Sequence, residues 1–160
     1  MKNFTIQFLF LTLLLTGCAS DPNDFTLSFS IESIDIYKLS IEINKDRSYL
    51  IQQQNLYLDK FANQERIETS QGTMTDEEYA KLKELIAGSR LFRMKDSYGF
   101  DKEPESMNPL SDFIYQLRYT QGRKTKYISL RPNSNDKFPA PFNQLIQFLA
   151  QYASNKQVPE

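Results

Sequence analysis

The side chains most able to do chemistry in this sequence are carboxylates gathered in one stretch. Asp96, Asp101, Glu103 and Glu105 lie close together along the chain, and Asp112 follows at the edge of the group. Carboxylate oxygens can hold calcium, and two carboxylates kept roughly 5–9.5 Å apart can hydrolyse a glycosidic bond. The spacing does not match an EF-hand loop, however, and both chemistries need groups that are held rigidly. We therefore expect a solvated acidic segment here, with no metal site and no catalytic pair.

Residues 96–111 lack apolar periodicity and contain Gly99, Pro104 and Pro109, so we expect them to form a long exposed loop. Long loops in compact domains often make contact with partners. This loop is therefore our candidate for binding a protein partner, through Tyr98, Phe100, Asp101, Glu103 and Glu105.

A second group interleaves cations with tyrosines in a predicted hairpin, with strands at 113–120 and 124–131 around a turn at 121–123. Interleaved basic and aromatic side chains can bind nucleic acid, but they also suit a sheet with one buried face and one solvated face. The chain has 19 basic and 20 acidic residues, so no overall field attracts nucleic acid. We expect no nucleic-acid partner; an acidic protein or an anionic glycan is the alternative. The residues concerned are Tyr115, Tyr119, Tyr127, Arg118, Arg123, Lys124, Lys126 and Arg131.

Residue types that are missing remove most of the common catalytic mechanisms. The sequence has no histidine and one cysteine, which excludes serine–histidine and cysteine–histidine nucleophile pairs, internal disulfides and multi-cysteine zinc sites. The five glycines are scattered singly, so no phosphate-binding glycine loop is present. We therefore expect a protein that is not an enzyme and needs no cofactor. Catalysis by carboxylate, lysine or tyrosine side chains is the less favoured alternative.

The amino-terminal segment predicts export from the cytoplasm. Lys2 precedes an apolar run from Phe4 to Leu15, and no acidic residue occurs before Asp21. A membrane-spanning helix needs about 20 apolar residues, so this run is too short to span comfortably. A cation, a short apolar core and small residues at its end are typical of a secretory signal peptide.

The end of this segment, Leu15-Thr16-Gly17-Cys18, resembles the lipobox of bacterial lipoproteins. The resemblance implies that a lipoprotein signal peptidase cuts between Gly17 and Cys18, and that Cys18 then carries the acyl chains. Two or more such chains anchor a protein stably in a membrane. The alternatives are an uncleaved membrane helix, or an ordinary signal peptide in which Cys18 plays no part.

These observations divide the first part of the chain into a leader at 1–17 and a lipidated cysteine with a short tether at 18–24. The predicted location is the bacterial cell envelope, lipid-anchored through Cys18. Ala19 stands where enterobacterial lipoproteins kept in the inner membrane carry aspartate, so we expect the outer membrane, on its periplasmic or its surface-exposed face.

Alternation of apolar and polar residues with period two begins at Phe25 and predicts the strands of a sheet. The alternation of apolar and polar residues shifts by one position near Ile34, which indicates a break between two strands. Outside the hairpin, the expected strands cover residues 25–31, 37–43, 48–58 and 66–70, with polar turns at 44–47 and 59–64.

Two helices are expected in the second half. Thr75 is followed three residues later by Glu78, which is the pattern of a capping box. Apolar residues at helical spacing continue from there to Gly88, which is expected to stop the helix. Residues 142–152 have the apolar stripe of a second helix.

The order of strands, helix, hairpin and helix predicts an α+β fold with an antiparallel sheet of about five strands and two helices. A chain of 160 residues suits a single domain, which we place at 25–152. Residues 153–160 are expected to form a flexible tail.

The carboxy-terminal half is also similar to emfourin-type inhibitors of protealysin-type metalloproteases and to small envelope proteins of unknown function. The similarity covers a capped helix with the core Leu82-Lys83-Glu84-Leu85-Ile86, then Leu91-Phe92, the strand at 112–117, and a closing helix from Phe142. It implies protease inhibition as an alternative function. The leading expectation is a non-catalytic binding or interaction domain at the bacterial envelope.

Overall fold

Apolar residues at every second position produce the first two strands, as expected. In β1 (Phe25–Ser33) and β2 (Tyr37–Ile43), buried side chains alternate with half-buried or exposed ones. The computed structural model describes residues 24–33, 35–62, 64–100, 113–131 and 137–156. Its other elements are β3 (Ser48–Gln54), α2 (Leu56–Ala62), β4 (Ile67–Thr73), α3 (Asp76–Ser89), the 3-10 helix η2 (Leu91–Arg93), β5 (Ser97–Tyr98), β6 (Phe113–Gln121), β7 (Lys124–Leu130) and α4 (Ala140–Asn155).

The strands form one seven-stranded sheet in the order β4-β3-β2-β1-β6-β7-β5. All neighbouring strands are antiparallel except β5, which pairs with β7 in parallel. The predicted α+β class is therefore confirmed. The expected count of about five strands in an antiparallel sheet is wrong: the six strand segments expected along the chain all join the sheet, and β5 adds a seventh strand that is parallel to its neighbour. The described residues also form three α-helices where two were expected.

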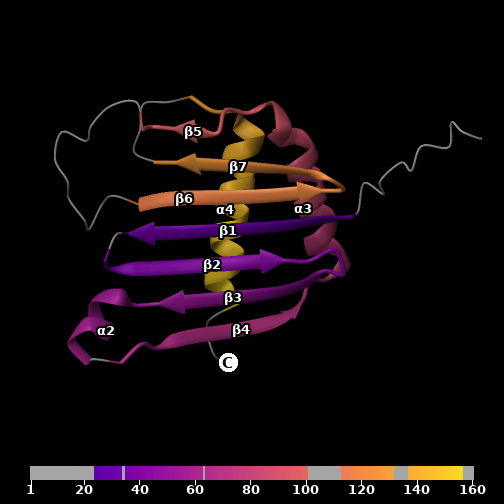
Figure 1. Cartoon of the computed structure of the whole chain (residues 1–160). Helices are drawn as coiled ribbons and strands as arrows, with labels where there is room; N and C mark the ends of the chain where they lie inside the picture. The colour runs from indigo at the N-terminus through magenta and orange to yellow at the C-terminus, as the bar shows by residue number, and fades with distance from the viewer. Residues whose placement is uncertain (1–23, 34, 63, 101–112, 132–136, 157–160) are drawn as a thin grey trace, which may run out of the picture.

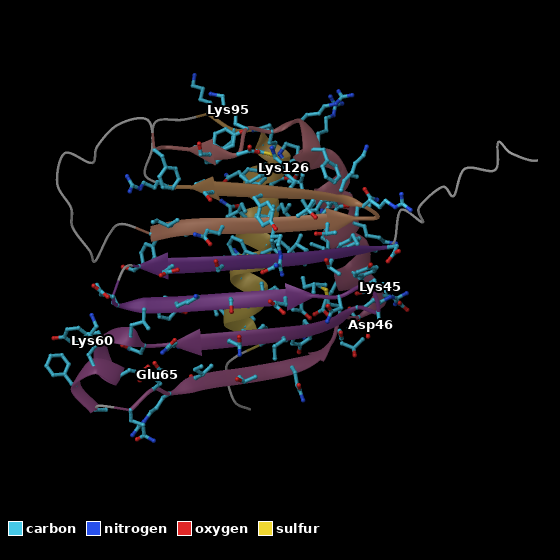
Figure 2. All side chains as sticks on the ribbon, in the orientation of Figure 1. Lys45, Asp46, Lys60, Glu65, Lys95 and Lys126 are labelled. Atoms are coloured by element: carbon cyan, nitrogen blue, oxygen red, sulfur yellow. The ribbon has the colours of Figure 1, made fainter. Side chains whose placement is uncertain are left out.

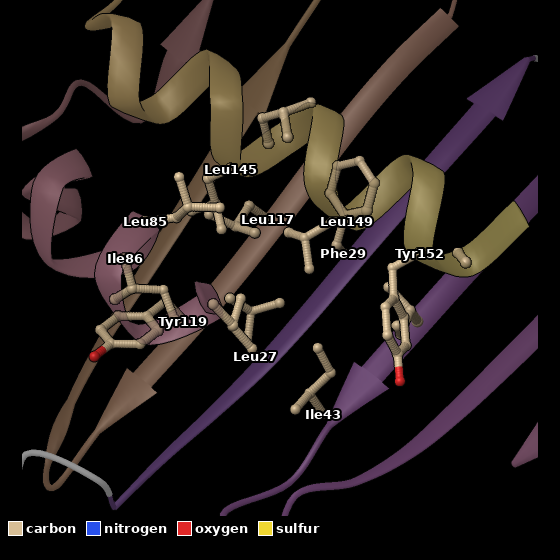
Figure 3. Close-up of a cluster of buried hydrophobic side chains, with 14 of the residues drawn as sticks. Leu27, Phe29, Ile43, Leu85, Ile86, Leu117, Tyr119, Leu145, Leu149 and Tyr152 are labelled. Atoms are coloured by element: carbon tan, nitrogen blue, oxygen red, sulfur yellow. The ribbon is translucent and has the colours of Figure 1, made fainter. Parts of the chain in front are cut away.

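Helices α3 and α4 lie behind the sheet and cover one of its two faces, whereas α2 lies at one end of the strands (Figure 1). The hydrophobic core fills the space between the sheet and these two helices. Leu145 and Leu149 of α4 lie over Phe29 and Leu117 of the central strands (Figure 3), and all four side chains are fully buried or nearly so. No described element covers the opposite face.

The capping box predicted at the start of α3 is confirmed. The Thr75 side chain accepts a hydrogen bond from the Glu78 backbone N–H at 3.2 Å, and the Glu78 carboxylate accepts one from the Thr75 N–H at 2.8 Å. The helix does not stop at Gly88. A Cβ at that position would lie 3.2 Å from the Cβ of Pro141, so glycine lets α3 approach α4 closely. Arg90 makes the left-handed C-cap instead, with φ 51°.

The expected strand at 48–58 is wrong in its second half, and so is the turn expected at 59–64. The strand ends at Gln54, and α2 begins two residues later. Asn55 starts this helix, because its side-chain oxygen accepts a hydrogen bond from the Leu58 N–H at 3.0 Å.

Two further boundaries differ from the sequence-based ones. Part of the expected loop at 96–111 is the strand β5, which begins at Ser97. At the other end, α4 continues to Asn155, past the domain end placed at 152. Ala153 is fully buried, and the Ser70 hydroxyl donates a hydrogen bond to the Lys156 carbonyl at 3.0 Å, so the packed structure includes these residues. Within the described ranges, no helix has the length and apolar character needed to cross a bilayer.

Candidate functional site

The open face of the sheet is defined by the side chains that alternate with the buried ones. Strand register places one outward-facing residue from each of the seven strands in a continuous row across this face. Every member of this row, which we call the central row, has a hydroxyl or an amide side chain. In order, they are Thr69, Gln52, Ser40, Ser30, Gln116, Ser129 and Ser97.

The adjacent row on the side of Phe25 carries two charged groups, one on each side of β1. Ser28 pairs with Glu42 on one side and with Arg118 on the other, and Arg118 pairs with Tyr127. Strands in a sheet lie about 4.8 Å apart, so the backbones of Glu42 and Arg118 are roughly 10 Å apart across Ser28. Neither charge has an ion-pair partner among the described residues. Both are therefore available to a ligand.

The two rows enclose an open hollow of ≈ 380 Å³, which we call the sheet-face hollow. Tyr127 stands at its side with 61% of its surface exposed. The lining residues offer hydroxyls and amides that donate and accept hydrogen bonds, one acceptor carboxylate, one guanidinium donor and one aromatic ring. They are Ser28, Ser30, Glu42, Gln116, Leu117, Arg118, Tyr127, Ile128 and Ser129. This arrangement can bind a ligand rich in hydroxyl groups.

The predicted partner-binding loop is only partly described, and Tyr98 does not belong to a binding surface. Its side chain is 8% exposed and packs edge-to-face on Phe138, with ring centroids 5.8 Å apart. The interpretation of Tyr98 as a surface contact is therefore wrong, because this residue lies on the inner side of β5. Phe100 is exposed, and the Arg131 guanidinium lies 4.7 Å from its ring centroid. Asp101, Glu103 and Glu105 lie outside the described residues.

The basic and aromatic residues of the hairpin separate onto the two faces of the sheet. Tyr115 and Tyr119 point into the core, and burial raises the pKa of both phenols above the ordinary value. Lys126 also turns inward, where its ammonium contacts the Met94 carbonyl and the Asp96 carboxylate. Of the hairpin residues considered in the sequence, Arg118 and Tyr127 remain on the open face. The hairpin is therefore no continuous basic and aromatic platform.

Gly17 and Cys18, the predicted cleavage and lipidation residues, lie outside the described part of the chain. Within that part, no three acidic or cysteine side chains form a group that could hold a metal ion.

Sequence reasoning missed the residues of the sheet-face hollow, although a signal for them was present. The polar positions of β1, at Thr26, Ser28 and Ser30, carry hydroxyls in place of the lysines and glutamates common on solvated strands. Their partners Glu42 and Gln116 come from other parts of the chain, so only the register reveals the cluster.

Two comparisons bear on what the chain resembles. No model of a known protein family matches it, and no curated protein does. The resemblances to lipoproteins and to emfourin-type inhibitors thus stay predictions. The binding function proposed below depends on the central row and the sheet-face hollow.

Proposed function

We propose that the chain is a lipid-anchored protein of the bacterial envelope that acts as a non-catalytic binding domain, with a glycan as the ligand of its open sheet face. The observation that carries this proposal is the central row together with the sheet-face hollow. A row across seven strands extends over roughly 29 Å, which suits an elongated ligand.

The neutrality of the central row supports binding. Covering a charged side chain with a ligand costs several kcal/mol unless the charge is paired, whereas a hydroxyl or an amide is covered at low cost if it gains a hydrogen bond. Seven neutral polar side chains in one row therefore suit a surface that loses its water on binding.

The chemistry of the hollow favours a glycan over other polymers. Sugar hydroxyls both donate and accept hydrogen bonds, as do the Ser28 and Ser30 hydroxyls and the Gln116 amide. The Tyr127 ring offers an exposed apolar surface on which the C–H face of a sugar can pack. The Arg118 guanidinium can bind a carboxylate where the glycan carries one.

The predicted tether is compatible with a ligand at the membrane surface. Cys18 precedes Phe25, the first residue of β1, by seven residues. Seven extended residues reach at most about 25 Å, so lipidation of Cys18 would hold the domain close to the bilayer.

The binding test uses the mature lipidated protein in detergent and a panel of soluble oligosaccharides and envelope polysaccharides. Tyr127→Ala should weaken binding about tenfold, because it removes the aromatic platform. Tyr57→Ala is the matched control, since Tyr57 is an exposed tyrosine at 53% on α2, away from the hollow. If no glycan binds, or if both variants bind equally poorly, the open face is not a glycan-binding site.

Lipidation is tested separately with Cys18→Ala in cells. The variant should lose incorporation of labelled fatty acid and should leave the membrane fraction. A variant that is still processed and still sediments with membranes would contradict the lipid anchor.

A second candidate function is favoured by an exposed apolar cluster at the end of the sheet that is distant from Phe25. Tyr57 and Phe61 of α2 contact each other with ring centroids 4.8 Å apart, and Leu58 is also exposed. Clusters of this kind often contact proteins. We propose a protein partner there. The emfourin resemblance covers the carboxy-terminal half and not α2, and it implies a metalloprotease as a partner of the chain as a whole. Titrating the protein into a thermolysin-like protease tests this, and full protease activity at every ratio would exclude it.

A further inference from the structure

A larger hollow lies at the end of the sheet where the central strand β1 begins. It has a volume of ≈ 700 Å³ and lies between the carboxy-terminal half of α3, η2 and the adjoining ends of β1 and β6. We call it the basic groove. Its aromatic lining is continuous, since Tyr119 contacts Phe25 and Phe92 with ring centroids 5.7 and 5.5 Å apart. The full lining is Phe25, Lys83, Ile86, Ala87, Arg90, Leu91, Phe92, Arg93, Tyr119 and Gln121.

The charged residues of the groove are all cations. Lys83, Arg90 and Arg93 line it, and no acidic side chain does. The turn after Gln121 adds Arg123 and Lys124 beside it. Among the described residues, no ion pair neutralises Arg90, Arg93, Arg123 or Lys124.

Other cations at this end of the sheet are neutralised, which makes the groove distinct. Lys45 lies 3.5 Å from Asp24, and Arg47 contacts Asp76. Figure 2 shows Lys45 and Asp46 at this end, and Lys60 and Glu65 at the opposite end. At this end of the sheet, the cations of the described residues that have no ion pair are therefore concentrated at the groove and its adjoining turn.

The backbone at Arg90 explains why two arginines meet in the groove. Arg90 has φ 51° and ψ 45°, a left-handed conformation that glycine adopts at many helix ends and that disfavours residues with a Cβ. This conformation turns the chain sharply from α3 into η2. As a result Leu91 enters the core, while Arg90 and Arg93 both line the groove. The helix cap thus places the two arginines at the same hollow.

The groove also lies at the end of the domain that the tether enters. Phe25 is both the first residue of β1 and part of the groove lining. In the proposed lipoprotein, the seven-residue step from Cys18 to Phe25 would keep the start of the groove within about 25 Å of the acyl chains.

We propose that the basic groove and its adjoining turn bind the headgroups of anionic phospholipids in the anchoring membrane. Arginine and lysine side chains near a membrane surface are attracted to anionic lipids, and aromatic side chains favour the interfacial region. Phe92, which is 41% exposed beside Arg93, supplies such a side chain. This contact orients the domain with the start of β1 toward the bilayer, so that α2 and the far ends of the strands point away from it. The inference rests on the proposed lipid anchor.

The test reconstitutes the mature lipidated protein into vesicles of phosphatidylcholine alone, or with phosphatidylglycerol added. Flotation measures anchoring, and amide hydrogen exchange of residues 83–95 and 121–125 measures contact with the headgroups. We expect equal flotation on both vesicles, with exchange in these segments slower by on the order of tenfold on the anionic vesicles. High salt should remove the difference, since it screens exposed charges.

Arg90→Gln combined with Arg93→Gln should abolish the slower exchange without changing flotation. Lys38→Gln combined with Arg66→Gln is the matched control, because it removes the same charge at the opposite end of the sheet and should retain the slower exchange. Equal exchange on both vesicles, or equal loss in both double variants, would overturn the proposal. Inorganic phosphate added to phosphatidylcholine vesicles should leave exchange in these segments unchanged. Slower exchange under that condition would also overturn the proposal, because the groove would then bind a soluble anion and not a lipid headgroup.

This experiment distinguishes failure of the proposed lipid anchor from failure of the proposed headgroup binding. Flotation on anionic vesicles alone, lost in the Arg90→Gln and Arg93→Gln variant, would contradict the lipid anchor but support the groove. Absence of flotation on both vesicles would overturn both.

Discussion

The two faces of the sheet are built from the same strands but carry opposite chemistry. Phe29 and Ser30 are neighbours in β1, yet Phe29 is 1% exposed beneath α4, and Ser30 lies in the central row on the open face. The covered face is almost entirely apolar, whereas the central row of the open face has no apolar side chain and no charge. Stability therefore comes chiefly from one face, and the other is available for binding. Substitutions on the covered face should then change the free energy of unfolding, and substitutions on the open face should change ligand binding.

The largest effect is expected where a helix meets the covered face. Phe142 of α4 is fully buried, so Phe142→Ala should lower the free energy of unfolding by about 3–5 kcal/mol, through lost burial and the cavity left behind. Urea denaturation measures this change. Phe61→Ala is the control, because Phe61 is 74% exposed and should change stability by less than about 0.5 kcal/mol. Equal losses would show that the covered face does not dominate stability.

A smaller effect is expected at the start of α3, the other helix on the covered face. Thr75→Ala removes the side chain that accepts the hydrogen bond of the Glu78 N–H. The free energy of unfolding should fall by about 1 kcal/mol. Thr75→Ser keeps the acceptor oxygen and should restore most of that loss in the same denaturation assay. A serine variant as unstable as the alanine one would show that the methyl group, not the cap, matters.

Glu78 also links the two covering helices, which makes part of their stability dependent on pH. Burial raises the pKa of Glu78, but hydrogen bonds from Thr75, the Lys156 ammonium and the Tyr152 hydroxyl outweigh it and hold the pKa below its ordinary value of 4.5. The unfolded chain therefore takes up the proton first. Stability from this group is present above about pH 5 and is lost as the pH falls through 4.5 and below.

The free energy of unfolding, measured as a function of pH in a matched pair of variants, tests whether Glu78 loses its stabilising effect as the pH falls. Glu78→Gln should flatten the acidic limb of the profile. Glu84→Gln should leave the limb nearly unchanged, because Glu84 is an exposed residue paired only with Lys81 in the same helix, at 2.9 Å. An acidic limb that is equally steep in both variants would assign the pH dependence to other carboxylates.

The covered face was largely predictable from sequence, because local patterns determine it. Alternation in β1 and the capping box of α3 each involve residues close in the chain, and both predictions were confirmed. Tyr98 was misplaced because a two-residue strand leaves no periodic signal, and its position depends on pairing with β7. Asn55 was read as part of a strand, although it starts α2, since apolar residues on either side fit both structures.

The open face was the least predictable region, because no local pattern specifies it. Ser30 is brought beside Gln116 only by the pairing of β1 with β6, across more than eighty positions of sequence. Polar residues at alternate positions predict an exposed side of a strand, but they do not reveal which strands lie beside it. The candidate site could be recognised only once the register was known.

The smallest effect on stability, and one of the most informative, is therefore expected on that face. Ser30→Ala combined with Gln116→Ala removes polar groups at the centre of the central row without opening a cavity, so stability should change by less than about 0.5 kcal/mol. Glycan binding should fall about tenfold or more, because two hydrogen-bonding side chains of the hollow are lost. Gln71→Ala is the control, since Gln71 lies on edge strand β4, outside both the central row and the hollow. Loss of stability with unchanged binding in the Ser30 and Gln116 variant would reverse the roles of the two faces, since the polar rows would then support the fold itself.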